Sequence, residues 1–252
     1  MLEEITISLL VIYLLAATSS AIVKTGTGVG AGIFLLPILS LVLDPKAALG
    51  VGAPIMLVSD IIGIRLYWKE WETHEILLII PPSIFGVVIG VIFVDLISSA
   101  VFKYWIGVFA ISYVSYYFII RIKKNFSIFK KEWNLGRGFG IIFGFLGGFL
   151  STISHAGGVI LSIYLTAKDI NKRCFVGVFV FFFLVTNTLK TFGYILVGII
   201  SFRDILIVLM LSPFIVLGGY FGNFLNKKIS QTIFRDLIYI IILISGLKLF
   251  FK

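Results

Sequence analysis

The sequence predicts an all-α polytopic membrane protein. Three observations predict it: 60% of the 252 residues are hydrophobic, only 13% are charged, and long apolar runs recur along the chain. One soluble core cannot bury so much apolar surface, and a membrane-spanning helix needs about 20 mostly apolar residues. The single cysteine and two histidines argue against a disulfide framework and a multi-histidine metal site. We expect a multi-pass protein of the cell membrane without a metal ion or cofactor.

The apolar segments fall into two sets of five, separated by a polar interval. The first set starts directly after "MLEE", which has no basic n-region, so we expect its first segment to remain as a helix rather than to be a cleaved signal. The segments are 5–23, 27–43, 47–67, 75–95 and 100–120, followed by 137–154, 157–167, 172–199, 204–225 and 231–251.

The polar interval "RIKKNFSIFKKEWNLGR" carries six Lys or Arg and one acid, which is typical of a cytoplasmic loop. It predicts a first transmembrane repeat over 1–120, a basic linker over 121–136 and a second repeat over 137–252. The net charge of +9 then reflects membrane orientation and not nucleic-acid binding. Five crossings in each half would invert one half relative to the other and place most basic residues on the linker side. Four crossings, with 27–43 and 157–167 re-entrant, would divide the basic residues almost evenly, so the inverted arrangement is favoured.

The two halves share a pattern that predicts an internal duplication. "PPSIFGVVIG" and "PFIVLGGYFG" place two glycines at the same distances after a proline, and "LVSD" in the first half corresponds to "LVTN" in the second. Asp60 therefore corresponds to Asn187. Farther upstream, Gly32 corresponds to Gly158 with the offset shifted by one residue.

The stretch "KTGTGVGAGIFLLP" has the glycine density of a phosphate-binding turn, but its flanks are membrane spans and no Gly-Lys-Ser/Thr follows. Close helix packing is one explanation for such glycines. An unwound helix that exposes N–H groups to an anion is the other, and "SHAGG" occupies the matching place in the second half. We therefore expect broken glycine-rich helices and substrate-binding residues in both elements: Gly26, Thr27, Gly28, Gly30, Gly32, Ser154, His155, Gly157 and Gly158.

The motif "GTGVGAGIFLLP", the second glycine element "GFLGGFLSTISHAGG", the basic linker and the chain length together resemble the TauE/SafE sulfite exporter family, also called toluene-sulfonate uptake permeases. The resemblance extends over essentially the whole chain. It implies a membrane carrier for small sulfur-containing anions such as sulfite or organosulfonates. The chain departs from the family pattern at "SHAGG", where a run of glycines is expected, and at Ser162, near which a proline would follow.

Polar residues inside the apolar segments are the remaining candidates, because a charge at membrane depth usually faces a cavity or a partner. Asp60, Asn187 and Lys190 come first, and Lys190 lies one helical turn beyond Asn187. Lys190 is expected either to pair with Asp60 or to meet the substrate. Ser59 and Arg65 are further substrate-binding candidates. Asp60 and His155 are the predicted proton carriers, since histidine titrates near neutral pH.

The sequence thus predicts a secondary transporter of a small sulfur-containing anion, with proton coupling as an open alternative and no catalytic residues. Its expected partners are the anionic substrate and the lipid bilayer, without nucleic acid; homo-oligomerisation is left open. An anion channel and a non-transporting membrane assembly protein are the alternatives from other classes. The aromatic run "FVFFF" (Phe179–Phe183) is expected to face lipid or the membrane interface.

Overall fold

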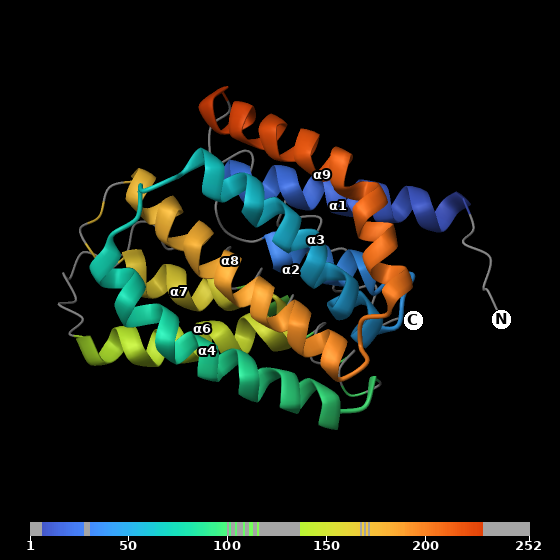
Figure 1. Cartoon of the computed structure of the whole chain (residues 1–252), viewed down its shortest axis with the longest axis horizontal. Helices are drawn as coiled ribbons and strands as arrows, with labels where there is room; N and C mark the ends of the chain where they lie inside the picture. The colour runs from blue at the N-terminus through green and yellow to red at the C-terminus, as the bar shows by residue number, and fades with distance from the viewer. Residues whose placement is uncertain are drawn as a thin grey trace.

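The computed structural model describes residues 7–27, 31–99, 137–166 and 172–228, together with positions 101, 104, 108, 111, 112, 115, 168 and 170. Predicted segment 100–120 lies largely outside these residues, and linker 121–136 and segment 231–251 lie entirely outside them. The described helices pack side by side (Figure 1). They are α1 (Ile7–Thr27), α2 (Ala31–Leu39), α3 (Pro45–Leu66), α4 (Thr73–Leu96), α6 (Arg137–Ser154), α7 (Gly157–Thr166), α8 (Lys172–Leu196) and α9 (Phe202–Lys228).

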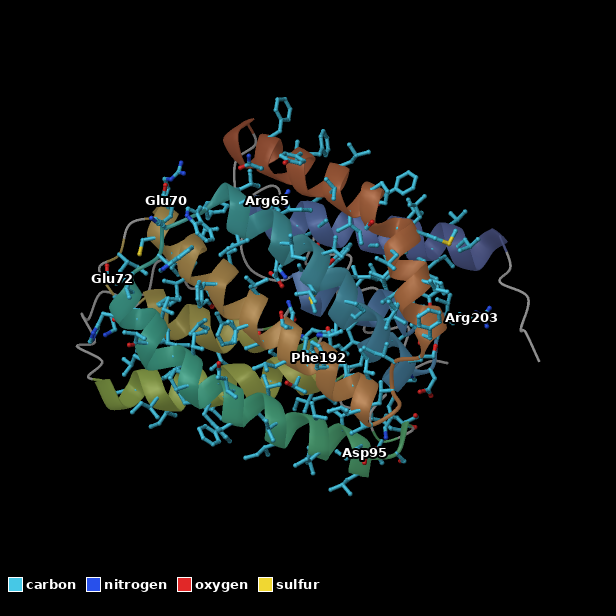
Figure 2. All side chains as sticks on the ribbon, viewed as in Figure 1. Arg65, Glu70, Glu72, Asp95, Phe192 and Arg203 are labelled. Carbon is cyan, nitrogen blue, oxygen red and sulfur yellow. The ribbon has the colours of Figure 1, made fainter. Side chains whose placement is uncertain are left out.

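Four of these helices, α3, α4, α8 and α9, are long and apolar enough to cross a membrane, and the described residues contain no strand. Large apolar side chains such as Phe85 and Leu96 on α4 and Leu217 on α9 are exposed, as expected of surfaces that face lipid. Four charged side chains mark the ends of the bundle, Glu70 and Glu72 at one end and Asp95 and Arg203 at the other (Figure 2). The predicted all-α polytopic membrane fold is confirmed.

Helices α2 and α7 are short. They have 9 and 10 residues, or about 14 to 15 Å at 1.5 Å per residue, roughly half of the apolar thickness of a bilayer. Neither helix can cross alone, unlike the full spans that the ten-segment arrangement gives to 27–43 and 157–167. Each is instead packed against the helix before it, α2 against α1 and α7 against α6. The predicted breaks are therefore present as two broken helix pairs, one in each half.

The helices of the two halves make corresponding contacts, so that replacing each helix by its counterpart in the other half gives nearly the same set of packed pairs. Helix α4 packs on α6 and α8, and the corresponding α9 packs on α1 and α3, while α3 and α8 pack on each other. Small residues permit these contacts: a Cβ on Gly86 would overlap the Phe145 carbonyl of α6, and a Cβ on Gly218 would meet the Thr18 carbonyl of α1. A duplicated chain would produce this pattern. The inverted relation of the halves stays a prediction.

Helix α8 lies in the interior of the bundle, and this overturns one expectation. Phe179 and Phe182 are fully buried and Phe183 nearly so, so the lipid-facing position predicted for the aromatic run is wrong. The run packs among α3, α4 and α6, where aromatic side chains supply the large apolar surfaces of a core. Aromatic content alone does not distinguish a central membrane helix from a peripheral one.

Candidate functional site

The two helix breaks touch each other. Helix α6 ends at Ser154 and α7 begins at Gly157, and His155 between them has a φ of 54°, in the left-handed region that favours glycine. This conformation stops α6 and turns the chain into α7. A Cβ on Gly32, near the start of α2, would overlap the carbonyl and Cβ of His155. The glycine element of the first half is therefore in contact with that of the second.

The His155 side chain is buried and hydrogen-bonded through both ring nitrogens. Its Nε2 lies 3.1 Å from the Leu49 carbonyl oxygen of α3, and its Nδ1 lies 2.7 Å from Lys190 Nζ of α8. A carbonyl oxygen only accepts hydrogen bonds, so Nε2 carries a hydrogen and Nδ1 offers its lone pair to the lysine. Gly52 makes room for this ring, because a Cβ there would lie 2.8 Å from Nε2.

Lys190 is fully buried in the middle of α8. Besides His155 Nδ1, its Nζ donates to the Ser151 carbonyl oxygen at 3.1 Å and contacts Ser151 Oγ at 3.3 Å. Among the residues that the structure describes, no carboxylate lies within ion-pair distance of Lys190. Its amine is thus held by neutral groups of α6 and of the α6–α7 break.

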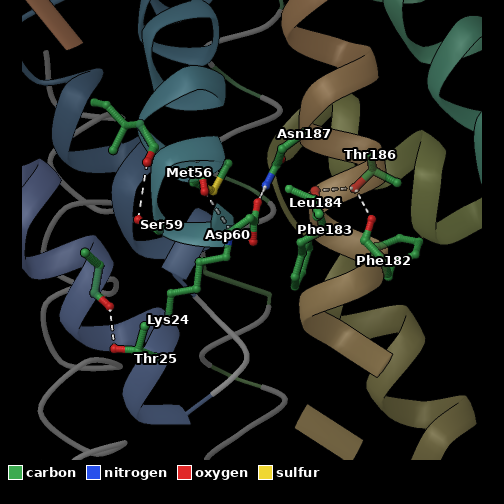
Figure 3. A network of polar contacts seen from close by, with 12 residues as sticks. Lys24, Thr25, Met56, Ser59, Asp60, Phe182, Phe183, Leu184, Thr186 and Asn187 are labelled. Atoms are coloured by element: carbon green, nitrogen blue, oxygen red, sulfur yellow. Dashed lines mark hydrogen bonds and ion pairs between the residues drawn. The ribbon is translucent and has the colours of Figure 1, made fainter. Parts of the chain in front are cut away.

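Asp60 has a different partner from the one expected. Its Oδ1 forms an ion pair with Lys24 Nζ at 2.5 Å, and its Oδ2 accepts a hydrogen bond from Asn187 Nδ2 at 2.5 Å (Figure 3). Lys24, in the last turn of α1, also donates to the Met56 carbonyl oxygen at 3.1 Å. Its Nζ lies 5.0 Å from the centre of the Phe183 ring, a cation–π contact. The predicted pairing of Lys190 with Asp60 is therefore replaced by a Lys24–Asp60 pair.

Helix α8 joins the two sets of contacts. Asn187, which binds Asp60, lies one turn before Lys190. We call Lys24, Asp60, Asn187, Lys190 and His155 the buried polar cluster; all are buried. With both lysines and the aspartate ionised, the cluster carries one excess positive charge. An anion is the ligand whose charge would balance it.

The other predicted site residues are placed as follows. Gly26, Gly157 and Gly158 are buried at the breaks. Ser59 and Ser154 are buried but donate to carbonyls of their own helices, Ile55 at 3.2 Å and Leu150 at 3.0 Å, as serine in helices often does. Arg65 is exposed in the last turn of α3 and takes part in none of the contacts described for the cluster (Figure 2). Gly28, Gly30 and the Thr27 side chain lie outside the described residues.

Three further participants lie outside the set of predicted site residues. Lys24 is ambiguous from sequence, because a lysine at the end of an apolar run can line a cavity or extend to the membrane interface. The Ser151 hydroxyl is one of several serine and threonine hydroxyls that could bind an anion, and the Leu49 carbonyl gives no signal because it is a backbone group. In the described part of the chain, no three His, Cys, Asp or Glu side chains come together as they would around a metal ion.

A comparison with protein families matches residues 13–249 to the family described as "Sulfite exporter TauE/SafE". No curated protein and no solved structure matches the chain. The family consists of membrane transporters of sulfur-containing anions and not of enzymes, in agreement with the apolar helices described above. The match covers nearly the entire chain, including both glycine elements and every residue of the buried polar cluster. This multi-pass membrane protein therefore belongs to the TauE/SafE sulfite exporter family.

Proposed function

We propose that this chain is a secondary transporter that moves a small sulfur-containing anion, such as sulfite or an organosulfonate. The observation that carries the proposal is Lys190, a buried amine without a carboxylate partner in the described part of the chain. A buried cation is costly unless it is paired, and an incoming anion would supply the missing charge. The family supplies the class of anion.

The surroundings of Lys190 offer further anion-binding groups. Helix α7 begins at Gly157, two residues after His155, and α2 begins at Ala31, next to Gly32. In general, the first turn of a helix carries N–H groups that lack acceptors within that helix and the positive end of the helix dipole. Glycine at these places lets the two elements approach closely, because a Cβ on Gly32 would overlap His155 and a Cβ on Gly157 would overlap the Gly147 carbonyl. The anion would thus lie between the two breaks, within reach of Lys190.

A carrier fits this arrangement better than a channel. The buried polar cluster is closed off, because Lys190, Asp60 and Asn187 have no exposed surface. An anion could reach them only after helices separate, which favours alternating access over a continuous pore. The contacts between the halves, α4 with α6 and α1 with α9, are the surfaces along which such a movement would take place.

The test is uptake of labelled sulfite into proteoliposomes, with taurine, sulfoacetate and sulfate as competitors. We compare the wild type with Lys190→Met and with Lys69→Met, a matched control in which the replaced lysine lies exposed in the loop between α3 and α4. We expect saturable uptake by the wild type and the control, and at least a tenfold loss in Lys190→Met, equivalent to about 1.4 kcal/mol. Absence of flux for every sulfur anion would refute the proposed function. Ion currents far above carrier rates would indicate a channel.

A further inference from the structure

The contacts of Lys190 suit two protonation states equally well. An ammonium group has three N–H donors, and the structure provides three acceptors: the Ser151 carbonyl oxygen, Ser151 Oγ and His155 Nδ1. A neutral amine would donate to the Ser151 carbonyl and His155 Nδ1, and would accept a hydrogen bond from the Ser151 hydroxyl. Because a hydroxyl both donates and accepts, the amine can gain or lose a proton here without any side chain having to move.

The other titratable groups of the buried polar cluster each have hydrogen-bond partners that suit one protonation state. Asp60 faces two donors, Lys24 on α1 and Asn187 on α8, which favour the ionised carboxylate. Lys24 has that carboxylate 2.5 Å away, which favours its protonated form. His155 donates through Nε2 to the Leu49 carbonyl, and a second proton on Nδ1 would point at the Lys190 amine, 2.7 Å away. Asp60 and His155, the proton carriers predicted from the sequence, therefore have partners that suit one protonation state, whereas the partners of Lys190 suit two.

The lack of a counter-ion connects this freedom to the substrate. A lysine ammonium at the centre of a membrane costs about 3 kcal/mol on insertion scales, and no carboxylate among the described residues lies within ion-pair distance of Lys190. The neutral amine therefore suits the empty site. When an anion arrives, its charge favours the ammonium, so anion and proton bind more tightly together than apart.

We infer that Lys190 takes up one proton with each monovalent anion and releases both on the opposite side of the membrane. This inference rests on the proposed function and extends it to a coupling ratio and a substrate charge. The proton binds the Nζ lone pair as the anion enters and leaves it as the anion departs, so the loaded site gains no net charge. The empty carrier returns with a neutral amine. Transport is consequently electroneutral.

The first test uses wild-type proteoliposomes and labelled methanesulfonate, the anion of a strong acid, so that any accompanying proton is carried by the protein. An exterior one pH unit more acidic should drive about tenfold accumulation inside. An imposed potential of about 60 mV should have no effect, whereas the same potential, positive inside, would accumulate an anion moving alone about tenfold. Accumulation driven by the potential and not by the pH gradient would overturn the inference and leave transport itself intact.

The second test assigns the proton to a residue. In Lys190→Arg the guanidinium is always protonated, so the pH gradient should no longer drive accumulation, whatever rate of methanesulfonate exchange the variant retains. Lys69→Met is the control: its lysine lies exposed in the loop between α3 and α4, and pH-driven accumulation should persist. Should Lys190→Arg fail to fold, Lys190→Gln replaces it, and its residual exchange must be insensitive to pH gradients.

The outcomes separate the two proposals. Accumulation driven by pH in a Lys190 variant would overturn the inference and return the proton to His155 or Asp60. Uptake of sulfite without methanesulfonate would show that the methyl group is rejected, and the two gradients would then be applied to sulfite, where accumulation driven by the potential and not by pH would overturn the inference. If neither sulfite nor methanesulfonate is transported, the proposed function is refuted.

Discussion

Removal of one partner from the Lys24–Asp60 pair is expected to destabilise the protein far more than removal of both. At 2.5 Å and an effective dielectric constant of about 20, the two charges attract by about 7 kcal/mol before desolvation is counted. Breaking a buried pair typically costs about 3 to 5 kcal/mol, because the remaining charge is uncompensated. Asp60→Asn leaves Lys24 buried without its carboxylate partner. At about 2 to 4 °C per kcal/mol, its midpoint of thermal unfolding should fall by roughly 6 to 20 °C.

The assay is thermal unfolding of the purified protein in detergent, followed by tryptophan fluorescence, for a double-mutant cycle. Lys24→Met should destabilise by a similar amount, since it leaves the Asp60 carboxylate with Asn187 alone. The double variant Lys24→Met/Asp60→Asn buries no unpaired charge and should recover most of the loss. Equal and additive effects of the two single substitutions would refute the reasoning that these charges stabilise each other.

Three further predictions concern packing and the ends of the helices. Gly148→Ala should destabilise the protein by about 1 to 3 kcal/mol in thermal unfolding, because its Cβ would overlap the Ser83 carbonyl of α4. The control Gly138→Ala on the same helix meets nothing within 4 Å and should be neutral or stabilising. Gly52→Ala should press on the His155 ring and reduce sulfite exchange while protein yield is retained, and full exchange would contradict the site. Glu75→Gln weakens the contact between Glu75 and Lys168 at 3.3 Å. A cysteine at this end of the bundle should then react faster with a thiol reagent, and an unchanged rate would show that the Glu75–Lys168 pair does not hold this end closed.

Much of the fold could be predicted from the sequence, because membrane insertion constrains it strongly. Apolar length predicted α3, α4, α8 and α9 closely, since only helices satisfy their backbone groups in lipid. The glycine elements correctly predicted two helix breaks. The sequence left open whether 27–43 and 157–167 span the membrane, since hydropathy reports which residues tolerate lipid and not how far a helix extends; α2 and α7 are too short to cross alone.

The sequence predicted most members of the buried polar cluster but not which of them pair with each other. Asp60, Asn187, Lys190 and His155 were all found from polarity in apolar segments. Which lysine meets Asp60 depends on how α1, α3 and α8 pack, and a single sequence does not specify those distances. The sequence also gave no sign that the backbone at His155 has a positive φ. The departure from the family's glycine run at that position did mark the place where a side chain enters the site.

The interlocked packing of the halves has a consequence for how the chain is made. Until α6 has been synthesised, α4 lacks the helix on which Gly86 packs, and α1 lacks α9 until later still. During synthesis α1 and α4 therefore stay in the bilayer without these partners, and the surface around Gly86 on α4 faces lipid. Assembly is completed only when helices distant in sequence arrive, so the first half expressed alone should be prone to degradation and should be rescued by co-expression of the second.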